Sequence, residues 1–301
     1  MAIPPAEHHI DEALVRRLLG SQCPDLAELP LQFGAAGWDN QMVRVGDRHV
    51  ARLPRRTVGD RLVLHEQRWL PEIAPRLPLP VPTPLVSGVP EHGYPWHWSV
   101  CPWLPGTTAA VSPPDDEAAT ADTLAAFLMA LHHPAPVDAP TNEFRSVPLA
   151  TRAEAFESRL SRLGEPRESG LERLGDDHTS RQLHDWWVDV AAIPPANVAP
   201  VLLHGDLHPA NLLVHDGRLA AVVDFGDICG GDPATDLAVA WMLFGHPGRD
   251  RFFSTLGTDP GTRRRAAGWA AVLALAFLAD DGGPMTPIGR RTIDALLTEF
   301  C

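Results

Sequence analysis

The first hundred residues alternate apolar and polar positions in short runs, which is typical of β-strands. Gly46-Asp47 separates two of these runs and predicts a tight turn. The expected strands are 31–34, 40–45, 49–53, 84–86 and 96–103. Because several runs follow one another with room only for short turns, they predict an antiparallel sheet.

One helix is expected within this region, over 57–76, because its apolar residues recur at i, i+7, i+8 and i+11 and so share one helical face. Those residues are Leu62, Trp69, Leu70 and Ile73. Pro71 and Pro75 leave the end of the helix open, since proline cannot donate a backbone hydrogen bond. The N-terminal region is therefore expected to be a small antiparallel β lobe with one helix.

Proline-rich sequence interrupts this pattern at Leu104-Pro105-Gly106 and Ser112-Pro113-Pro114. We expect a domain boundary here, with residues 1–103 as an N-terminal lobe and residues 104–301 as a C-terminal lobe. Apolar residues beyond the boundary recur mostly at helical spacing, so the second lobe is expected to be larger and mainly α. Its expected helices are 115–132, 151–163, 180–192 and one that begins after Asp232-Pro233.

A predicted hairpin in the second lobe brings chemically useful residues together. Two apolar runs flank Asp216-Gly217, a pair that favours a two-residue turn. If the strands pair about this turn, Asn211 lies opposite Val222, so Asn211 and Asp224 emerge at the same end of the hairpin. Asp206 lies five residues before Asn211, in the loop that leads to that end. Carboxylate and amide oxygens suit a hard cation such as Mg²⁺.

The same spacing is typical of phosphoryl transfer, which needs metal ions on the phosphate oxygens and a carboxylate that accepts the proton of the hydroxyl. In protein kinases, the Asp that accepts the proton is followed five residues later by a metal-binding Asn, and a second metal ligand is the Asp of an Asp-Phe-Gly triplet. The chain has Asp206 and Asn211 at that spacing, and the triplet is Asp224-Phe225-Gly226.

A family resemblance is strongest over 204–236, in HGDLHPAN at 204–211 and in DFGD followed by GDPATDLA from Asp224 onwards. The chain resembles the aminoglycoside phosphotransferase family of small-molecule kinases. Weaker motifs extend the resemblance to nearly the whole chain, at Gly37-Trp38-Asp39-Asn40, Ala51-Arg52-Leu53-Pro54 and Glu66. The resemblance implies a protein-kinase-like α+β fold.

The resemblance also implies an activity, the Mg²⁺-dependent transfer of the γ-phosphate of ATP or GTP to a hydroxyl of a small molecule. It makes Asp206 the catalytic residue, Asn211 and Asp224 the metal ligands, and Asp236 a structural residue. Relatives handle aminoglycosides, macrolides, choline-like alcohols, sugars and homoserine, so antibiotic resistance is one expected role.

For nucleotide binding, the protein-kinase fold usually pairs a strand Lys with a helix Glu, but this chain has 25 basic residues and all are Arg. Arg52 occupies the matching strand position and is expected to bind phosphate with Glu66 as its partner. The glycines Gly34 and Gly37 are expected to approach the phosphates. Backbone groups of the segment from Ser99 to Cys101 are expected to bind the nucleobase, because this segment is expected to join the two lobes.

Charge and composition narrow the partners. Most of the net charge of −13 lies in 104–301, which carries 27 acidic and 15 basic residues. We therefore expect a cationic acceptor and no binding of nucleic acid. The longest run of apolar residues, glycine included, is 266–279, too short for a membrane span, and the N-terminus has no signal-peptide pattern. The four Cys are far apart. A cytoplasmic protein with reduced thiols is expected.

Other functions remain open. The same fold could serve a metabolic small-molecule kinase or a macrolide kinase, or a non-catalytic nucleotide sensor. A metallophosphoesterase would require an Asn-His block, and the chain has no Asn-His pair. His204 is expected to be a scaffold residue, since Asp206 already fills the role of base.

Overall fold

The computed structural model describes residues 3–34, 37–164, 177–195, 199–280 and 283–301. The chain divides into two compact units. The N-terminal unit consists of Ala2–Pro105 together with Ala221–Ile228, and the C-terminal unit of Gly106–Ala220 together with Cys229–Cys301. The first division falls two residues beyond position 103, and the segment with the Asp-Phe-Gly triplet belongs to the N-terminal unit.

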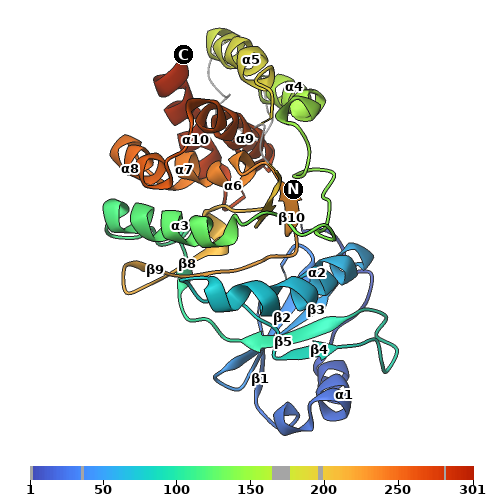
Figure 1. Ribbon diagram of the computed structural model, residues 1–301. Coiled ribbons are helices and arrows are strands. Elements are labelled where there is room, and N and C mark those ends of the chain that lie inside the picture. Colours follow the sequence, from blue (N-terminus) through green and yellow to red (C-terminus); the bar gives the residue numbers. More distant parts are fainter. Residues whose placement is uncertain (1–2, 35–36, 165–176, 196–198, 281–282) are drawn as a thin grey trace. The chain divides into compact units, whose positions relative to one another are not determined.

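A five-stranded antiparallel sheet forms the body of the N-terminal unit, in the order β1-β2-β3-β5-β4 (Figure 1). Its strands are β1 (Leu31–Phe33), β2 (Asn40–Val45), β3 (His49–Pro54), β4 (Val86–Gly88) and β5 (Trp98–Pro102). The predicted antiparallel sheet is confirmed. Strand β4 begins two residues later than expected.

Two helices accompany this sheet, α1 (Glu12–Gln22) and α2 (Thr57–Ile73). Apolar residues of α1 form one core cluster with Ala51 and Leu53 of β3, whereas Arg52 bonds to Glu66 of α2. Because neighbouring side chains of a strand point to opposite faces, α1 and α2 lie on opposite faces of the sheet. Helix α2 ends at Ile73 and a 3-10 turn, Ala74–Arg76, completes the segment predicted as helix.

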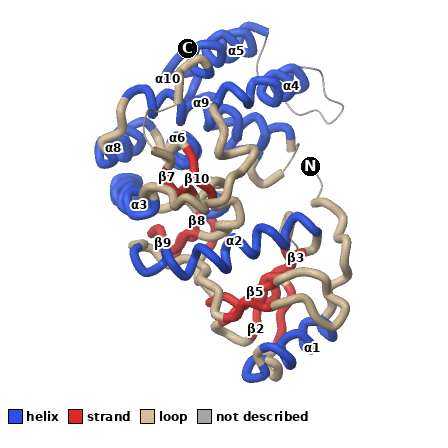
Figure 2. Tube along the Cα trace, turned by 45° about the vertical axis from the view of Figure 1, so that its right-hand side comes forward, coloured by secondary structure: helices blue, strands red, loops and turns tan. Residues whose placement is uncertain are grey.

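The C-terminal unit is largely helical, as predicted (Figure 2). Its helices are α3 (Glu117–Leu131), α4 (Ala153–Gly164), α5 (Asp177–Ala191), α6 (Ala234–Leu237), α7 (Val239–Leu243), α8 (His246–Leu256), α9 (Pro260–Ala279) and α10 (Thr286–Phe300). Helix α9 packs against α4, α5, α6, α7 and α10, and most of its residues are buried. Within the described ranges, no helix is both long and apolar enough to cross a membrane.

Short strands complete the C-terminal lobe. The predicted hairpin is formed by β8 (Leu212–His215) and β9 (Arg218–Val222), and β6 (Thr107–Thr108) pairs with β8. Asp216 and Gly217 have φ values of 49° and 70°. Two successive positive φ values are typical of a type I′ turn, for which Asp-Gly is well suited. Strand β7 (Val201–Leu203) pairs with β10 (Cys229–Gly231).

Candidate active site

The loop 204–211 leaves β7 and is fixed by one buried carboxylate. Asp236 accepts hydrogen bonds from the backbone amides of His204 (2.8 Å) and Gly205 (2.9 Å). It also contacts Nε2 of His132 at 3.0 Å. Gly205 has a φ of 87°, which a residue with a side chain rarely adopts, so the loop can turn sharply at this point. Asp236 therefore has the structural role that the family resemblance implies.

Asp206 follows this turn and stands between two potential cations. Its Oδ1 accepts a bond from Nη2 of Arg145 at 2.6 Å, and its Oδ2 lies 3.3 Å from Nε2 of His208. Burial alone would raise the pKa of Asp206, but the charges of His208 and Arg145 outweigh it, and the pKa lies below its usual value. Since 26% of the side chain remains exposed, the ionised carboxylate is accessible from solvent.

The side chain of Asn211 is oriented by the same loop. Asn211 ends a 3-10 turn, Pro209–Asn211, and its Nδ2 donates to the carbonyl oxygen of Asp206 at 2.9 Å. With the amide nitrogen engaged, the amide oxygen is the atom that Asn211 can offer to a metal ion. His204 supports the loop from within, because its Nδ1 accepts a bond from the backbone amide of Asp206 at 3.2 Å. His204 is fully buried, as expected for a scaffold residue.

In the N-terminal unit, a buried ion pair connects β3 with α2. Nη1 of Arg52 lies 2.6 Å from Oε1 of Glu66, and the two side chains are 7% and 3% exposed. Nη2 of Arg52 lies 3.3 Å from Oδ1 of Asp224. Burial would lower the pKa of Arg52, but Glu66 and Asp224 raise it above its usual value, so the guanidinium stays charged. The structure thus brings together three of the residues selected from the sequence.

Asp224 is held in an unusual conformation. Its φ is 66°, a left-handed value uncommon for residues other than glycine. The next residue anchors this conformation, because Phe225 is fully buried and its backbone amide donates to Oε1 of Glu66 at 2.9 Å. The side chain of Asp224 is 56% exposed, so one carboxylate oxygen faces Arg52 while the group remains open to a ligand. Backbone strain of this kind is frequent at functional sites.

The other nucleotide-binding predictions find less support in the geometry. The amides of Gly34 and Gly37 donate to the carbonyl oxygens of Met42 (3.0 Å) and Asn40 (2.9 Å), so neither amide is free for phosphate. The two residues between these glycines lie outside the described residues.

The segment from Ser99 to Cys101 lies within β5 and does not join the lobes, since the chain leaves the sheet only after Pro102. Ser99 pairs with Arg52 on one side and with Ser87 on the other. Cys101 pairs with Val50 alone. Burial raises the pKa of the Cys101 thiol to about 12, which makes it an inert core group. The expectation that this segment connects the lobes was wrong, because the β5 ladder continues to Pro102.

One residue of the site was not found from the sequence. Arg145 lies 61 residues before Asp206 in a loop without regular structure, and no motif or periodicity marks it. Only its position beside the carboxylate reveals it.

The Asp236 contacts lead to a prediction about stability. Asp236→Asn keeps the shape of the side chain but replaces one acceptor oxygen by a donor, so a buried backbone amide of the loop loses its partner. We expect a loss of about 1–3 kcal/mol in the free energy of unfolding at pH 7, measured by urea denaturation. Asp294→Asn is the matched control, because Asp294 is exposed on α10. A loss no larger than that of the control would contradict the anchoring role.

The loss of unfolding free energy in Asp236→Asn should become smaller in acid. Burial raises the pKa of Asp236, but the bonds and charges from His132, His204 and Gly205 lower it more, so the folded-state pKa lies below the ordinary value of about 3.9. A lowered pKa contributes stability above the unfolded-state value, and this contribution disappears as the pH falls through the folded-state value. The difference between the parent and Asp236→Asn should therefore shrink below about pH 4.

The chain is similar in sequence to curated proteins of one kind. The chain is 26% identical over 253 residues to an aminoglycoside 3'-phosphotransferase of Escherichia coli, covering 82% of this chain and 80% of that protein. It is 28% identical over 171 residues to an aminoglycoside 3'-phosphotransferase of Salmonella typhimurium, covering 54% of this chain and 59% of that protein.

Solved structures show the same fold. The GDP complex of aminoglycoside 2'-phosphotransferase-IIIa matches with a TM-score of 0.72 and 18% identity, covering 97% of this chain and 100% of that chain. Macrolide 2'-phosphotransferase type I matches with a TM-score of 0.61 and 21% identity, covering 99% of both chains. These likenesses confirm the predicted protein-kinase-like fold. The model of the phosphotransferase enzyme family matches residues 31–275, most of the chain, and the chain therefore belongs to this family.

Proposed function

We propose that this phosphotransferase transfers the γ-phosphate of ATP or GTP to a hydroxyl of a small molecule, with Asp206 as the base. The observation that carries the proposal is the loop in which Asp236 fixes the backbone and leaves Asp206 ionised and accessible. In the reaction, the acceptor oxygen forms a bond to the γ-phosphorus, the hydroxyl proton passes to the carboxylate of Asp206, and the nucleoside diphosphate leaves.

Arg52 is the proposed cation for the nucleotide phosphates. The chain has no Lys, and Arg52 is held in a fixed position by Glu66 at 2.6 Å. A guanidinium carries several donors in one plane, so it can bind two phosphate oxygens at once and remain charged at any working pH.

Mg²⁺ is the metal that suits the proposed ligands. Asn211 offers an amide oxygen because its Nδ2 is engaged, and Asp224 offers an exposed carboxylate. The remaining ligand positions of such an ion would be filled by nucleotide phosphates and water. When bound, Mg²⁺ would neutralise the charge of the phosphates.

Removal of either ligand tests this assignment. Asp224→Ala is expected to weaken Mg²⁺-dependent nucleotide binding by about tenfold or more, because a charged metal ligand is lost, and Asn211→Ala is expected to act in the same direction. Titration of nucleotide with and without Mg²⁺ measures both effects. Asp216→Ala removes a carboxylate from the hairpin turn, where the side chain is 89% exposed, and serves as the control. Unchanged metal dependence in both ligand variants would contradict the assignment.

The names of the relatives suggest which acceptors to test first. The curated relatives are aminoglycoside phosphotransferases, and one matching structure is a macrolide phosphotransferase. Aminoglycosides are polycations, so they also fit the acidic excess of residues 104–301. An assay of nucleotide consumption over aminoglycosides, macrolides, choline, homoserine and sugars, with detection of the phosphorylated product by mass, would separate a resistance enzyme from a metabolic kinase. Nucleotide binding without any turnover would favour a sensor instead.

A further inference from the structure

One arginine touches the proposed base, and two further arginines lie within electrostatic range of that arginine. Arg145 contacts Asp206 directly, at 2.6 Å. The residue before it, Phe144, carries the guanidinium of Arg152 over its ring, with the central carbon 5.3 Å from the ring centre. Arg152 thus contacts the residue that directly precedes Arg145, the arginine that touches Asp206.

Arg152 and Arg159 belong to one continuous helical segment, the 3-10 turn Leu149–Arg152 and α4. They are seven residues apart, which is about two helical turns and places both on one face. Arg159 reaches α9, where its Nη1 lies 3.5 Å from the carbonyl oxygen of Val272. Both side chains are half-buried. The Nε atom of Arg152 is buried and has no hydrogen-bond partner.

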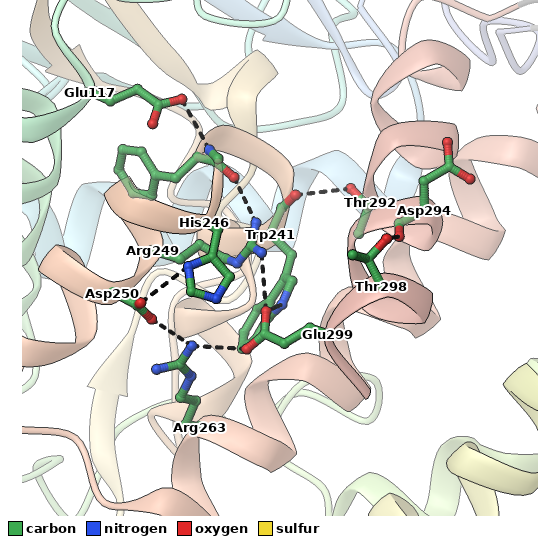
Figure 3. A network of polar contacts seen from close by, with 12 residues as sticks. Glu117, Trp241, His246, Arg249, Asp250, Arg263, Thr292, Asp294, Thr298 and Glu299 are labelled. Atoms are coloured by element: carbon green, nitrogen blue, oxygen red, sulfur yellow. Dashed lines mark hydrogen bonds and ion pairs between the residues drawn. The ribbon is translucent and has the colours of Figure 1, made fainter. Parts of the chain in front are cut away.

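Neither Arg152 nor Arg159 forms an ion pair with a carboxylate in the described part of the chain, whereas other arginines of the same unit do. Arg249 and Arg263 converge on Glu299, at 3.1 and 2.8 Å (Figure 3). A third ion pair joins Arg265 to Asp232 at 2.6 Å. Carboxylates thus pair with Arg249 and Arg263 in the network of Figure 3, whereas Arg152 and Arg159, which form a positive cluster with Arg145, have no carboxylate partner among the described residues.

The electrostatic energy of this arginine cluster is unfavourable when no anion is bound. Burial, followed by repulsion from Arg145, lowers the pKa of Arg152, and burial with repulsion from neighbouring arginines lowers that of Arg159. Both groups nevertheless stay protonated, because arginine does not lose its proton in proteins. A bound anion would remove the repulsion and supply acceptors for the donors that lack partners.

We propose that Arg145, Arg152 and Arg159 bind an anionic group of the acceptor, so that the acceptor is an alcohol that carries a carboxylate or a phosphate. The inference rests on the proposed function, since it takes Asp206 as the base that receives the hydroxyl proton. Arg145 donates one hydrogen bond to Asp206 and has further donors for the anion. It would therefore hold the anionic group of the acceptor at a fixed position relative to the base that receives the hydroxyl proton.

This acceptor has the opposite charge to the one expected from composition. The excess of acidic residues describes 104–301 as a whole, whereas recognition depends on the field at the site itself. A polycation would meet the guanidinium of Arg145 at Asp206 and the guanidinium groups of Arg152 and Arg159, and repulsion between these like charges and the polycation would weaken its binding.

The first experiment measures anion binding without turnover. Calorimetric titration of the full-length protein with malonate and with inorganic phosphate is done with saturating nucleoside diphosphate, so that the nucleotide's phosphate positions are filled. We expect the double variant Arg152→Gln/Arg159→Gln to bind malonate or phosphate at least about tenfold more weakly than the parent. Arg264→Gln, an exposed residue of α9, is the control and should bind like the parent. Absence of anion binding to the parent, or equal binding by the double variant, would overturn the proposal.

The second experiment compares alcohols that differ only in charge, such as 4-hydroxybutyrate, its amide and 4-aminobutan-1-ol, together with glycerol 3-phosphate and glycerol. A higher kcat/KM for the carboxylate or the phosphate member supports the proposal and identifies which anion is preferred. A preference for the amine or the neutral member overturns it while leaving the kinase function intact. If neither these alcohols nor the acceptors of the wider assay are phosphorylated, the proposed function fails, and the titration alone decides whether the arginines bind an anion.

Discussion

Asp206→Asn is expected to lower kcat by about 10²-fold or more while the nucleotide Kd changes little. The substitution keeps the size of the side chain and its place in the loop but removes the group that accepts the hydroxyl proton. An effect on kcat without an effect on nucleotide affinity would assign Asp206 to the chemical step and not to binding. A turnover within about threefold of the parent would contradict the role.

The structure indicates that this variant tests the chemical step and not the folding of the loop, and it also offers a control. The loop is held by Asp236 through the backbone amides of His204 and Gly205, and the substitution leaves these bonds in place. Asp216→Asn is a matched control, because Asp216 is an exposed turn residue with a φ of 49°, a conformation that Asn tolerates. Unfolding curves of both variants would show whether stability is preserved.

The environment of Asp206 also predicts the pH profile. Because His208 and Arg145 hold its pKa below the usual value, Asp206 is ionised at and above about pH 4. The rate should therefore show no fall attributable to Asp206 above about pH 4, and any acid limb at higher pH belongs to another group.

Arg52→Ala is expected to raise the nucleotide KM and to lower kcat together, because the phosphates carry negative charge in both the ground state and the transition state. The variant also leaves Glu66 buried without its partner, at a cost of about 3–5 kcal/mol in the free energy of unfolding. Kinetics should therefore be measured at a temperature at which circular dichroism shows the variant to be folded.

Arg52→Lys separates charge from geometry. An ammonium keeps the positive charge near Glu66 and Asp224 but cannot form two parallel bonds to one phosphate, so we expect it to recover only part of the loss. Arg48→Ala is the control, since Arg48 is exposed in the turn between β2 and β3. Full activity of Arg52→Ala would mean that the phosphates are bound without this arginine.

The sequence was most informative where local rules dominate. Strands β2 and β3 and the hairpin turn at Asp216-Gly217 follow from alternation and turn chemistry, and both are confirmed. Helix α9 was not predicted, because it is buried on nearly all sides and so shows no polar face to give its apolar residues a period. Helix α1 was also overlooked, although Asp11 caps its first turn by accepting from the amide of Leu14.

The candidate site likewise contains residues that the sequence predicts and a contact that only the structure reveals. Asp206, Asn211 and Asp224 are close in sequence, and their spacing has chemical meaning. The contact between Arg145 and Asp206 links residues 61 positions apart, and such a contact depends on how helices and loops pack. The charge around Asp206 therefore became visible only in three dimensions, and it is this charge that separates an anionic acceptor from a cationic one.

The inclusion of residues 221–228 in the N-terminal unit has a consequence for the order of folding during synthesis. The amide of Val222 donates to the carbonyl of Pro80, and that of Phe225 donates to Glu66. These contacts form only after more than two hundred residues have been translated. The first hundred residues therefore leave the ribosome before residues 221–228, which complete the N-terminal unit, have been made. Until then the carboxylate of Glu66 lacks its bond from the amide of Phe225, and the nascent N-terminal lobe is the stage at which we expect chaperone binding and proteolysis to be most frequent.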